Sequence, residues 1–363
     1  MKVLNLVDHL QHGGVQRMAV NVANSLDQFG VDSHLCSIIE KGELSSLVSN
    51  SVKFFSLDAP NIFSLSAAAD LRSYCKFNEI DIVHVHHRSL FLAFQSFVFN
   101  SRVKLIWHDH YGRQEFRSRP WLVYYLLTRR VDGVISVSHA LKDWSVNSMR
   151  LSAERVRFIP NYVESTKISS KTSQIHLPGM PGFRIVCVAN FRPHKDHFTL
   201  LRGLKKLLQN EPQAHLILVG KIENVEYFQN LKSMITEMSL SNNVTNLGER
   251  MDVGSILYES DVGVLSSSSE GLPLTLIEYG AASLPVVCTS VGDCPWLIKD
   301  HERGLLFQPG SPDELAEKLS KLLNDNHLRK YLGENLNHFV EENLNQNEIL
   351  QQIMDFYKET LQT

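Results

Sequence analysis

The sequence predicts an α/β protein with two tandem, Rossmann-like, doubly wound domains, each built on a parallel sheet. Short apolar runs alternate with segments of helical periodicity along nearly the whole chain, as expected of parallel strands covered by helices on both faces. The alternation breaks once, in a polar Ser/Thr-rich stretch, and then resumes. A length of 363 residues also exceeds what one ordinary core accommodates.

The first series of elements predicts an N-terminal domain over residues 1–165. Helical periodicity over 16–29 and 67–78 separates its strands, and the apolar run 90–99 predicts a core helix, with an interfacial helix as the alternative. That run is too short to span a membrane, which takes about 20 residues. The opening MKVLNLVDHL predicts a buried strand and not a signal peptide. The predicted strands are 3–7, 33–39, 52–57, 82–86, 103–108, 133–137 and 156–159.

A polar segment, residues 166–182, predicts the linker to a C-terminal domain over 183–344. Periodicity over 200–209 and 314–323 predicts helices in that domain. The final amphipathic segment, 345–363, either closes the second domain or crosses back to the first. The predicted strands are 184–189, 215–219, 244–247, 262–265, 286–289 and 304–307.

Composition limits the class of protein. Hydrophobic residues make up 43% and charged residues 21% of the chain, which is ordinary for a soluble globular protein. The five cysteines form no CxxC pair, so we expect no disulfide framework or structural zinc and a reducing, cytoplasmic location. A formal net charge of −3 and the lack of a nucleic-acid-binding motif disfavour nucleic acid as a partner.

Ligands bind at the carboxyl ends of parallel strands, so two such edges facing each other predict a cleft between the domains. The HGGVQR loop at 12–17 follows the first strand and opens a helix, where glycines allow close backbone approach and helix amides favour an anion. A plain turn is the alternative. The loop lacks GxGxxG, which disfavours a dinucleotide-binding dehydrogenase.

The FRPHKD loop at 191–196 follows the first strand of the second series. Arg192 offers a fork of donors and Lys195 a point charge, a pairing that suits a diphosphate. A solvated loop is the alternative interpretation.

The stretch SEGLPLTLIE at 269–278 carries the strongest signal. Pro273 is expected at the first helical position, which leaves the amides of Leu274 and Thr275 directed at a phosphate. Glu270 lies before the helix and Glu278 inside it, and carboxylates accept hydrogen bonds from sugar and ribose hydroxyls. A capping glutamate plus a surface glutamate is the alternative.

Histidines cluster at two strand ends, at positions 84, 86, 87, 108 and 110. Their spacing is similar to that of metal ligands, but strand alternation sends His87 to the opposite face from His84 and His86, and no carboxylate cluster joins them. We therefore predict no metal site, and His108 is of interest as a cleft residue.

Residues 113–130 are rich in arginine and aromatic side chains. Such a segment suits an anionic membrane surface or a lipid diphosphate, and a solvated loop and helix face is the alternative.

The motifs HGGVQR, SVSHAL (136–141), IPNYV (159–163), FRPHKD and the E-x7-E of EGLPLTLIE occur together in this order. In this combination the chain resembles, over nearly its whole length, the retaining GT-B glycosyltransferases of the large family that includes bacterial capsule, O-antigen and lipid-linked glycan enzymes. Two positions depart from the family pattern: Ser283 stands where a glycine is usual, and Trp296 where an acidic residue is frequent.

The resemblance implies a nucleotide-sugar donor held mainly by the C-terminal domain, with a UDP-sugar as first choice and GDP-mannose as second. Arg192 and Lys195 would bind the diphosphate, Glu278 the ribose and Glu270 the sugar hydroxyls. The other implied donor-binding residues are Gly14, Gly248, Glu249, Gly271, Leu272, Leu274 and Thr275. His108 would lie near the sugar and join Glu270, Arg192 and Lys195 as the catalytic set.

The implied acceptor is a glycan or a polyprenyl-diphosphate-linked sugar, met by the first domain through His12, His86, His110 and Arg113. The expected reaction is a retaining transfer in surface polysaccharide biosynthesis, by front-face displacement, without metal or cofactor, and peripheral to the cytoplasmic face of the inner membrane. The terminal helix would cross back to the first domain. A nucleotide-sugar epimerase or hydrolase, or a non-catalytic sugar-nucleotide-binding subunit, stays an alternative.

Overall fold

The computed structural model describes residues 1–11, 13–99, 102–110, 120–162 and 175–363. The chain divides into two compact units, which are described separately below. Unit 1 comprises residues 1–162 together with 346–363, and unit 2 comprises 163–345. Most of the expected linker, residues 166–182, lies outside the described residues.

Unit 1 is built on a seven-stranded parallel sheet with the order β3-β2-β1-β4-β5-β6-β7. The strand order reverses between β1 and β4, which pair directly, so the topological switch point of this sheet lies there. The strands are β1 (Lys2–His9), β2 (Asp32–Glu40), β3 (Lys53–Ser56), β4 (Ile82–His86), β5 (Lys104–Asp109), β6 (Gly133–Ser136) and β7 (Val156–Phe158).

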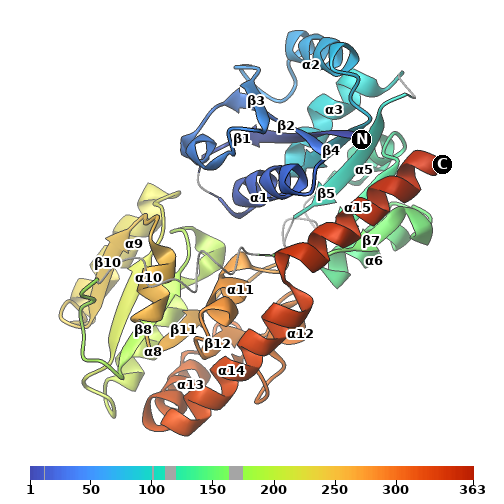
Figure 1. The fold of residues 1–363 in the computed structure, drawn as a ribbon. Helices are drawn as coiled ribbons and strands as arrows, with labels where there is room; N and C mark the ends of the chain where they lie inside the picture. The colour runs from blue at the N-terminus through green and yellow to red at the C-terminus, as the bar shows by residue number, and fades with distance from the viewer. Residues whose placement is uncertain (12, 100–101, 111–119, 163–174) are drawn as a thin grey trace. The chain divides into compact units, whose positions relative to one another are not determined.

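Helices cover both faces of this sheet (Figure 1). Its helices are α1 (Gly14–Gln28), α2 (Leu65–Phe77), α3 (Leu90–Phe97), α5 (Trp121–Thr128), α6 (His139–Asn147) and α15 (Gln346–Gln362), with single 3-10 turns at Glu43–Leu47, His87–Ser89 and Ala153–Arg155.

The last helix, α15, packs on unit 1 although 183 residues of unit 2 precede it. A Cβ on Gly133 of β6 would lie 2.7 Å from Cζ of Phe356, so the missing side chain lets the helix lie close over the sheet. Arg157 of β7 adds an ion pair to Glu359, 2.6 Å long.

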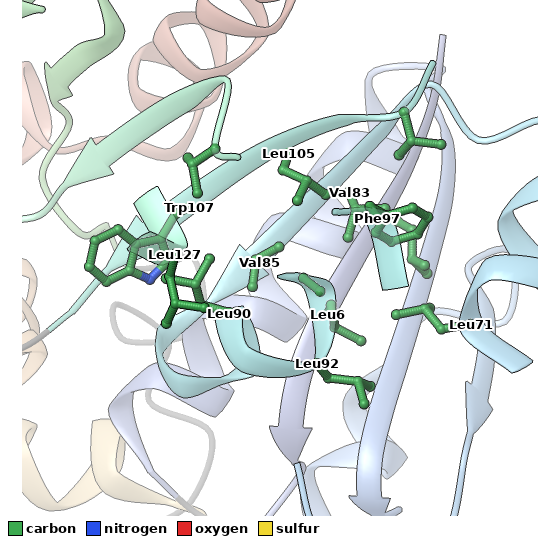
Figure 2. Packing of buried hydrophobic residues seen from close by; sticks show 14 of the residues in the cluster. Leu6, Leu71, Val83, Val85, Leu90, Leu92, Phe97, Leu105, Trp107 and Leu127 are labelled. Atoms are coloured by element: carbon green, nitrogen blue, oxygen red, sulfur yellow. The ribbon is translucent and has the colours of Figure 1, made fainter. Parts of the chain in front are cut away.

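The core on the opposite side of this sheet is assembled from strands and α3. Figure 2 shows Val83, Val85 and Leu105 in one cluster with Leu90 and Leu92 of the helix. All five side chains are essentially inaccessible to solvent. The first eight residues of the apolar run at 90–99 therefore form a core helix, as predicted, while Phe99 is 97% exposed. This packing fixes β4 and β5, whose carboxyl ends carry the histidines.

Unit 2 is built on a six-stranded parallel sheet with the order β10-β9-β8-β11-β12-β13. The reversal falls between β8 and β11, which are direct neighbours. The strands are β8 (Arg184–Val188), β9 (His215–Val219), β10 (Val244–Gly248), β11 (Val262–Leu265), β12 (Val286–Thr289) and β13 (Leu305–Phe307). The helices are α8 (His197–Leu207), α9 (Val225–Glu237), α10 (Val253–Tyr258), α11 (Leu274–Ala281), α12 (Cys294–Ile298), α13 (Pro312–Asn324) and α14 (Asn326–Asn343), with a 3-10 turn, η4, at Pro193–Lys195.

The structure confirms all thirteen predicted strands, each with ends within two residues of the expected ones. One local expectation is wrong by a position. Pro273 is the N-cap of α11, with ψ at 127°, and Leu274 is the first helical residue. An extended N-cap suits proline because its fixed φ is compatible with both conformations.

Candidate functional site

Two loops of unit 2 bring Lys195 and Glu270 into contact. Lys195 ends η4, in the loop after β8, and Glu270 lies between β11 and α11. These loops leave the two strands that flank the switch point. The Lys195 ammonium donates to Oε1 of Glu270, and each side chain is only 10% exposed. The sequence therefore placed both residues at one sheet edge, and the structure shows that they are partners.

Serines that follow β11 hold this ion pair in place. Ser267 Oγ donates to Glu270 Oε1 over 2.6 Å, while Ser266 Oγ donates to the Lys195 carbonyl over 3.0 Å. Thr289 of β12 donates to the Ser267 carbonyl over 2.6 Å. Because every one of these groups is buried, the carboxylate is oriented by the fold before any ligand arrives.

Glu270 is ionised in this setting. Burial acts to raise the pKa of its carboxyl, but the Lys195 charge and the hydrogen bonds from Lys195 and Ser267 outweigh burial and hold the pKa below its ordinary value. An ionised, oriented carboxylate is a strong acceptor for sugar hydroxyls.

Arg192, the second predicted cation, is also paired within unit 2. Its Nη1 lies 3.4 Å from Oε2 of Glu223, and Asn190 donates to the other oxygen of that carboxylate over 2.5 Å. Among the described residues, the buried Nε of Arg192 has no hydrogen-bond partner. The guanidinium is thus partly satisfied and retains a donor for a ligand.

Helix α11 begins beside these loops. The Leu276 amide bonds to the Pro273 carbonyl over 3.2 Å, which leaves Leu274 and Thr275 in the turn whose amides have no intrahelical acceptor. Thr275 Oγ1 donates to the Val188 carbonyl at the end of β8 over 3.1 Å, fixing the helix to the sheet. Glu278 is half-buried, one turn further along.

The remaining implied donor-binding residues occupy turns and helix starts. Gly271 accepts a hydrogen bond from the Asp293 amide over 3.0 Å, and Leu272 is buried. Gly248 ends β10 at a φ of +68°, a left-handed conformation that favours glycine, and Glu249 beside it is exposed. Gly14 opens α1 in unit 1. His12 and Arg113 lie outside the described residues.

In unit 1 the histidines form a ring stack at the carboxyl ends of β4 and β5. His84, His86 and His108 are fully buried, and His110 is half-buried. Ring centroids are 4.5 Å apart for His84 and His86, and 4.0 Å apart for His108 and His110. Strand alternation therefore gathers these side chains on one face, and His87 falls in the following 3-10 turn.

Hydrogen bonds run through the stack in two chains. His84 bonds to Tyr357 of α15 through Nδ1 and to His108 Nδ1 through Nε2, over 3.0 Å. His86 bonds to His110 over 3.2 Å and to Asn5 Oδ1 over 3.3 Å. His86 was implied as an acceptor ligand, and the structure places it at 0% exposure within this network.

Burial keeps these histidines neutral. It lowers the pKa of His84 and of His110 to about 3, and it holds the pKa of His86 and His108 well below the ordinary value, with added repulsion from the neighbouring histidines.

Ligand atoms of His84, His86 and His108 lie within 4.8 Å of one another, a spacing at which three histidines could hold a metal ion. An imidazole binds metal along the in-plane direction of its nitrogen lone pair. Nε2 of His84 and Nδ1 of His108 face each other over 3.0 Å in a hydrogen bond, so the lone pair of one ring is already engaged by its neighbour. The arrangement is a hydrogen-bonded network instead.

Sequence reasoning missed four polar partners: Ser267, Glu223, Asn5 and Tyr357. Ser267 belongs to a serine run directly after β11. Ligands bind at the carboxyl ends of parallel strands, so polar residues at this position indicate a binding site and could have been found from the sequence. Nothing local marks Tyr357, which meets His84 across 273 positions.

Two families of glycosyltransferase match successive parts of this chain. Residues 12–167 match Glycosyltransferase Family 4, and residues 170–339 match Glycosyl transferases group 1. Together with the two Rossmann-like units, these matches show that the chain belongs to the GT-B glycosyltransferases of group 1.

Curated relatives are similar over most of their length. The N-acetyl-alpha-D-glucosaminyl L-malate synthase of Bacillus anthracis is 24% identical over 313 residues, covering 82% of this chain and 80% of the relative. The UDP-Gal:alpha-D-GlcNAc-diphosphoundecaprenol alpha-1,3-galactosyltransferase of Escherichia coli is 24% identical over 335 residues, covering 86% and 85%.

Solved structures share the fold. HepE of Anabaena in complex with UDP-glucose superimposes with a TM-score of 0.85 at 20% identity, covering 99% of this chain and all of that one. Sucrose-phosphate synthase of Thermosynechococcus elongatus gives a TM-score of 0.83 at 18% identity, covering 99% and 98%.

Proposed function

We propose that this glycosyltransferase moves a sugar, with retention, from a UDP-sugar to a glycan or polyprenyl-diphosphate-linked acceptor in surface polysaccharide biosynthesis. The observation that carries the proposal is the meeting of Lys195, Glu270 and the start of α11 at the switch point of unit 2. A cation, an ionised carboxylate and free helix amides are the groups that a diphosphate next to a sugar requires. Two similar proteins support UDP as the nucleotide: HepE is solved in complex with UDP-glucose, and the Escherichia coli relative is named for UDP-Gal.

The chemistry breaks the bond between the anomeric carbon and the β-phosphate oxygen, and the acceptor hydroxyl oxygen forms the new bond. Negative charge grows on the departing diphosphate, and Arg192, Lys195 and the amides at α11 would stabilise it. Preorganised charges of this kind are usually the largest contribution to catalysis. The acceptor's proton would pass to the departing phosphate oxygen.

Front-face displacement is the form of retention that we propose. A double displacement needs a free carboxylate beside the anomeric carbon. Glu270 is instead held by Lys195 and Ser267, which favours a hydroxyl-binding role for it over a nucleophilic one.

A lipid-linked acceptor would bring the protein to a membrane surface. Trp121, Leu122 and Leu126 of α5 are each more than half exposed, and exposed Arg129 ends the same helix. This combination of apolar side chains and a cation suits an anionic lipid surface. No helix among the described residues has the length and apolarity that a membrane span requires.

Calorimetric titration of the protein with UDP-, GDP- and ADP-sugars, followed by turnover assays with lipid-linked acceptors, tests the proposal. We expect a UDP-sugar to bind and to be consumed only when acceptor is present. Consumption without acceptor would instead identify a hydrolase or epimerase, and binding without turnover would identify a non-catalytic subunit. Glu278→Gln should weaken binding of the nucleotide itself, whereas Glu270→Gln should weaken binding of the sugar nucleotide but not of UDP.

A further inference from the structure

A chain of three hydrogen-bonded groups links the last helix of the protein to the end of β5. Tyr357 on α15 bonds to Nδ1 of His84, and Nε2 of His84 bonds to Nδ1 of His108 over 3.0 Å. All three side chains are at most 1% exposed. Both ring nitrogens of His84 are hydrogen-bonded. A neutral imidazole carries one proton, so if one nitrogen accepts, the other must donate.

The direction of this chain follows from the phenol. Among the described residues, His84 is the only hydrogen-bond partner of the Tyr357 hydroxyl. If the hydroxyl accepted from His84, its own proton would have no acceptor and Nε2 of His108 would also stay unpaired, whereas the opposite direction leaves only Nε2 of His108 unpaired. Burial also raises the pKa of Tyr357 well above its ordinary value, so the phenol keeps its proton. Tyr357 therefore donates to Nδ1 of His84.

The tautomers of both histidines are then fixed. His84 is neutral, with Nδ1 accepting, so its proton lies on Nε2 and is donated to Nδ1 of His108. His108 is neutral as well, and its proton must lie on Nε2. That nitrogen is buried and has no hydrogen-bond partner among the described residues. At the carboxyl end of a parallel strand, where ligands bind, such an N–H can donate to a ligand oxygen.

We propose that Tyr357 is a positioning residue that acts through His84 and holds His108 in the Nε2–H tautomer, ready to donate to a hydroxyl or ether oxygen of the sugar substrate. The choice of a sugar as substrate rests on the proposed function, whereas the tautomers of His84 and His108 rest on the structure alone. The substrate and the tautomer can therefore be refuted independently.

The tautomer is tested without substrate, by long-range proton–nitrogen NMR of protein labelled with 15N-histidine, with the His108 signals assigned by their loss in His108→Asn. We expect a single Nε2–H form of His108 in the wild type. In Tyr357→Phe, which keeps the ring and removes the hydroxyl, His108 should populate both tautomers.

Tyr74→Phe is the matched control, since it removes another phenol of unit 1 that bonds to a histidine, His34, which lies outside the stack. It should leave the His108 tautomer and the rate unchanged. His84→Gln breaks the chain with Tyr357 intact and serves if Tyr357→Phe folds poorly; it too should release the His108 tautomer.

Kinetics supply the functional readout. With the UDP-sugar that the wild type consumes, Tyr357→Phe should lower kcat by at least about threefold, because only a fraction of the protein then carries the Nε2–H tautomer of His108. KM should change little.

An Nδ1–H form of His108 in the wild type, or an unchanged tautomer in both Tyr357→Phe and His84→Gln, would overturn the positioning role. A changed tautomer with unchanged kcat would refute the donor role of His108. A wild type that consumes no sugar nucleotide would refute the proposed function and leave the tautomer result to stand.

Discussion

Lys195 and Glu270, which flank the switch point of the second sheet, are hydrogen-bonded to each other. The same is true in weaker form of Arg192 and Glu223. Each cation that the proposed reaction assigns to the diphosphate is therefore already neutralised by a carboxylate. A bound nucleotide-sugar must share these cations or displace their carboxylate partners. A stronger internal pair should therefore weaken the binding of the nucleotide-sugar.

Breaking the buried pair from one side should destabilise the protein. Lys195→Met leaves Glu270 buried without its cation, and we expect a loss of about 3 kcal/mol in the free energy of unfolding. Burial then raises the pKa of Glu270, so the loss should be smaller at pH 5 than at pH 8. Denaturant unfolding measures both effects.

The controls for this pair are a double variant and a surface lysine. Lys195→Met with Glu270→Gln should cost less than the sum of the single changes, because no buried charge remains. Lys206→Met, which breaks an exposed pair with Asp313, should cost less than about 1 kcal/mol. Additive single effects would contradict a direct pair.

Glu223 competes with the proposed diphosphate for Arg192, so removing the Glu223 charge should strengthen binding of the nucleotide. Glu223→Gln is expected to tighten UDP binding by about two- to fivefold, the range that a partly exposed ion pair is worth. Calorimetric titration with UDP measures the change. Glu226→Gln, an exposed glutamate in the first turn of α9, is the control and should leave affinity unchanged. Weaker binding in Glu223→Gln would mean that Glu223 helps to hold the nucleotide.

The histidine stack predicts how stability depends on pH. The folded-state pKa values lie below the unfolded value of about 6.5, at about 3 for His84 and His110. The stability of the neutral stack is therefore fully present above pH 6.5 and is lost as pH falls, since the unfolded chain binds more protons. Each such histidine contributes a slope approaching about 1.4 kcal/mol per pH unit.

Denaturant unfolding at steps from pH 7.5 to pH 5 checks this expectation. The window lies above the ordinary range of carboxylate titration, so histidines dominate it. A free energy of unfolding that stays flat from pH 7 to pH 5 would show that the stack is protonated in the folded protein.

Ser283 is strained by its backbone. It follows the C-cap of α11 at a φ of +55°, and the amides of Ser283 and Leu284 bond back to Gly280 and Tyr279 over 2.9 Å each. This is the Schellman arrangement, in which the left-handed residue is usually glycine. Ser283→Gly should raise the free energy of unfolding by about 0.5 to 1 kcal/mol. Ser283→Ala keeps the Cβ and should change little; equal stability of the two variants would contradict the strain.

Membrane association should depend on α5. Leu122→Ser with Leu126→Ser is expected to weaken binding to anionic phospholipid vesicles by at least about tenfold, because two apolar side chains no longer enter the interface. Sedimentation with vesicles measures binding. Phe77→Ser changes an even more exposed apolar residue, on α2, and should have little effect. Equal loss in Phe77→Ser would show that general surface apolarity, and not α5, drives binding.

The order of elements could be predicted because each strand is a continuous apolar run set between helical patterns, a local property of the sequence. The positions of Arg192, Lys195, Glu270 and Glu278 followed from the same logic, since loops after parallel strands meet at one edge. What could not be predicted is which polar groups touch. The pairing of Lys195 with Glu270 depends on how two loops pack.

Local geometry set a second limit. Proline tolerates both the N-cap and the first helical position, so sequence could not choose between them for Pro273. The departure at Ser283 was visible in the sequence, but its positive φ depends on how α11 ends against the strand that follows.

Helix α15 makes unit 1 discontinuous in the sequence, and this has a consequence for synthesis. A ribosome completes the whole of unit 2 before it supplies the helix that covers Gly133 and caps His84. Domains fold as they emerge, so the later unit should reach its native state first, and the earlier one should wait with a polar histidine stack exposed to water. Protease resistance of stalled nascent chains should therefore develop in the reverse order of translation.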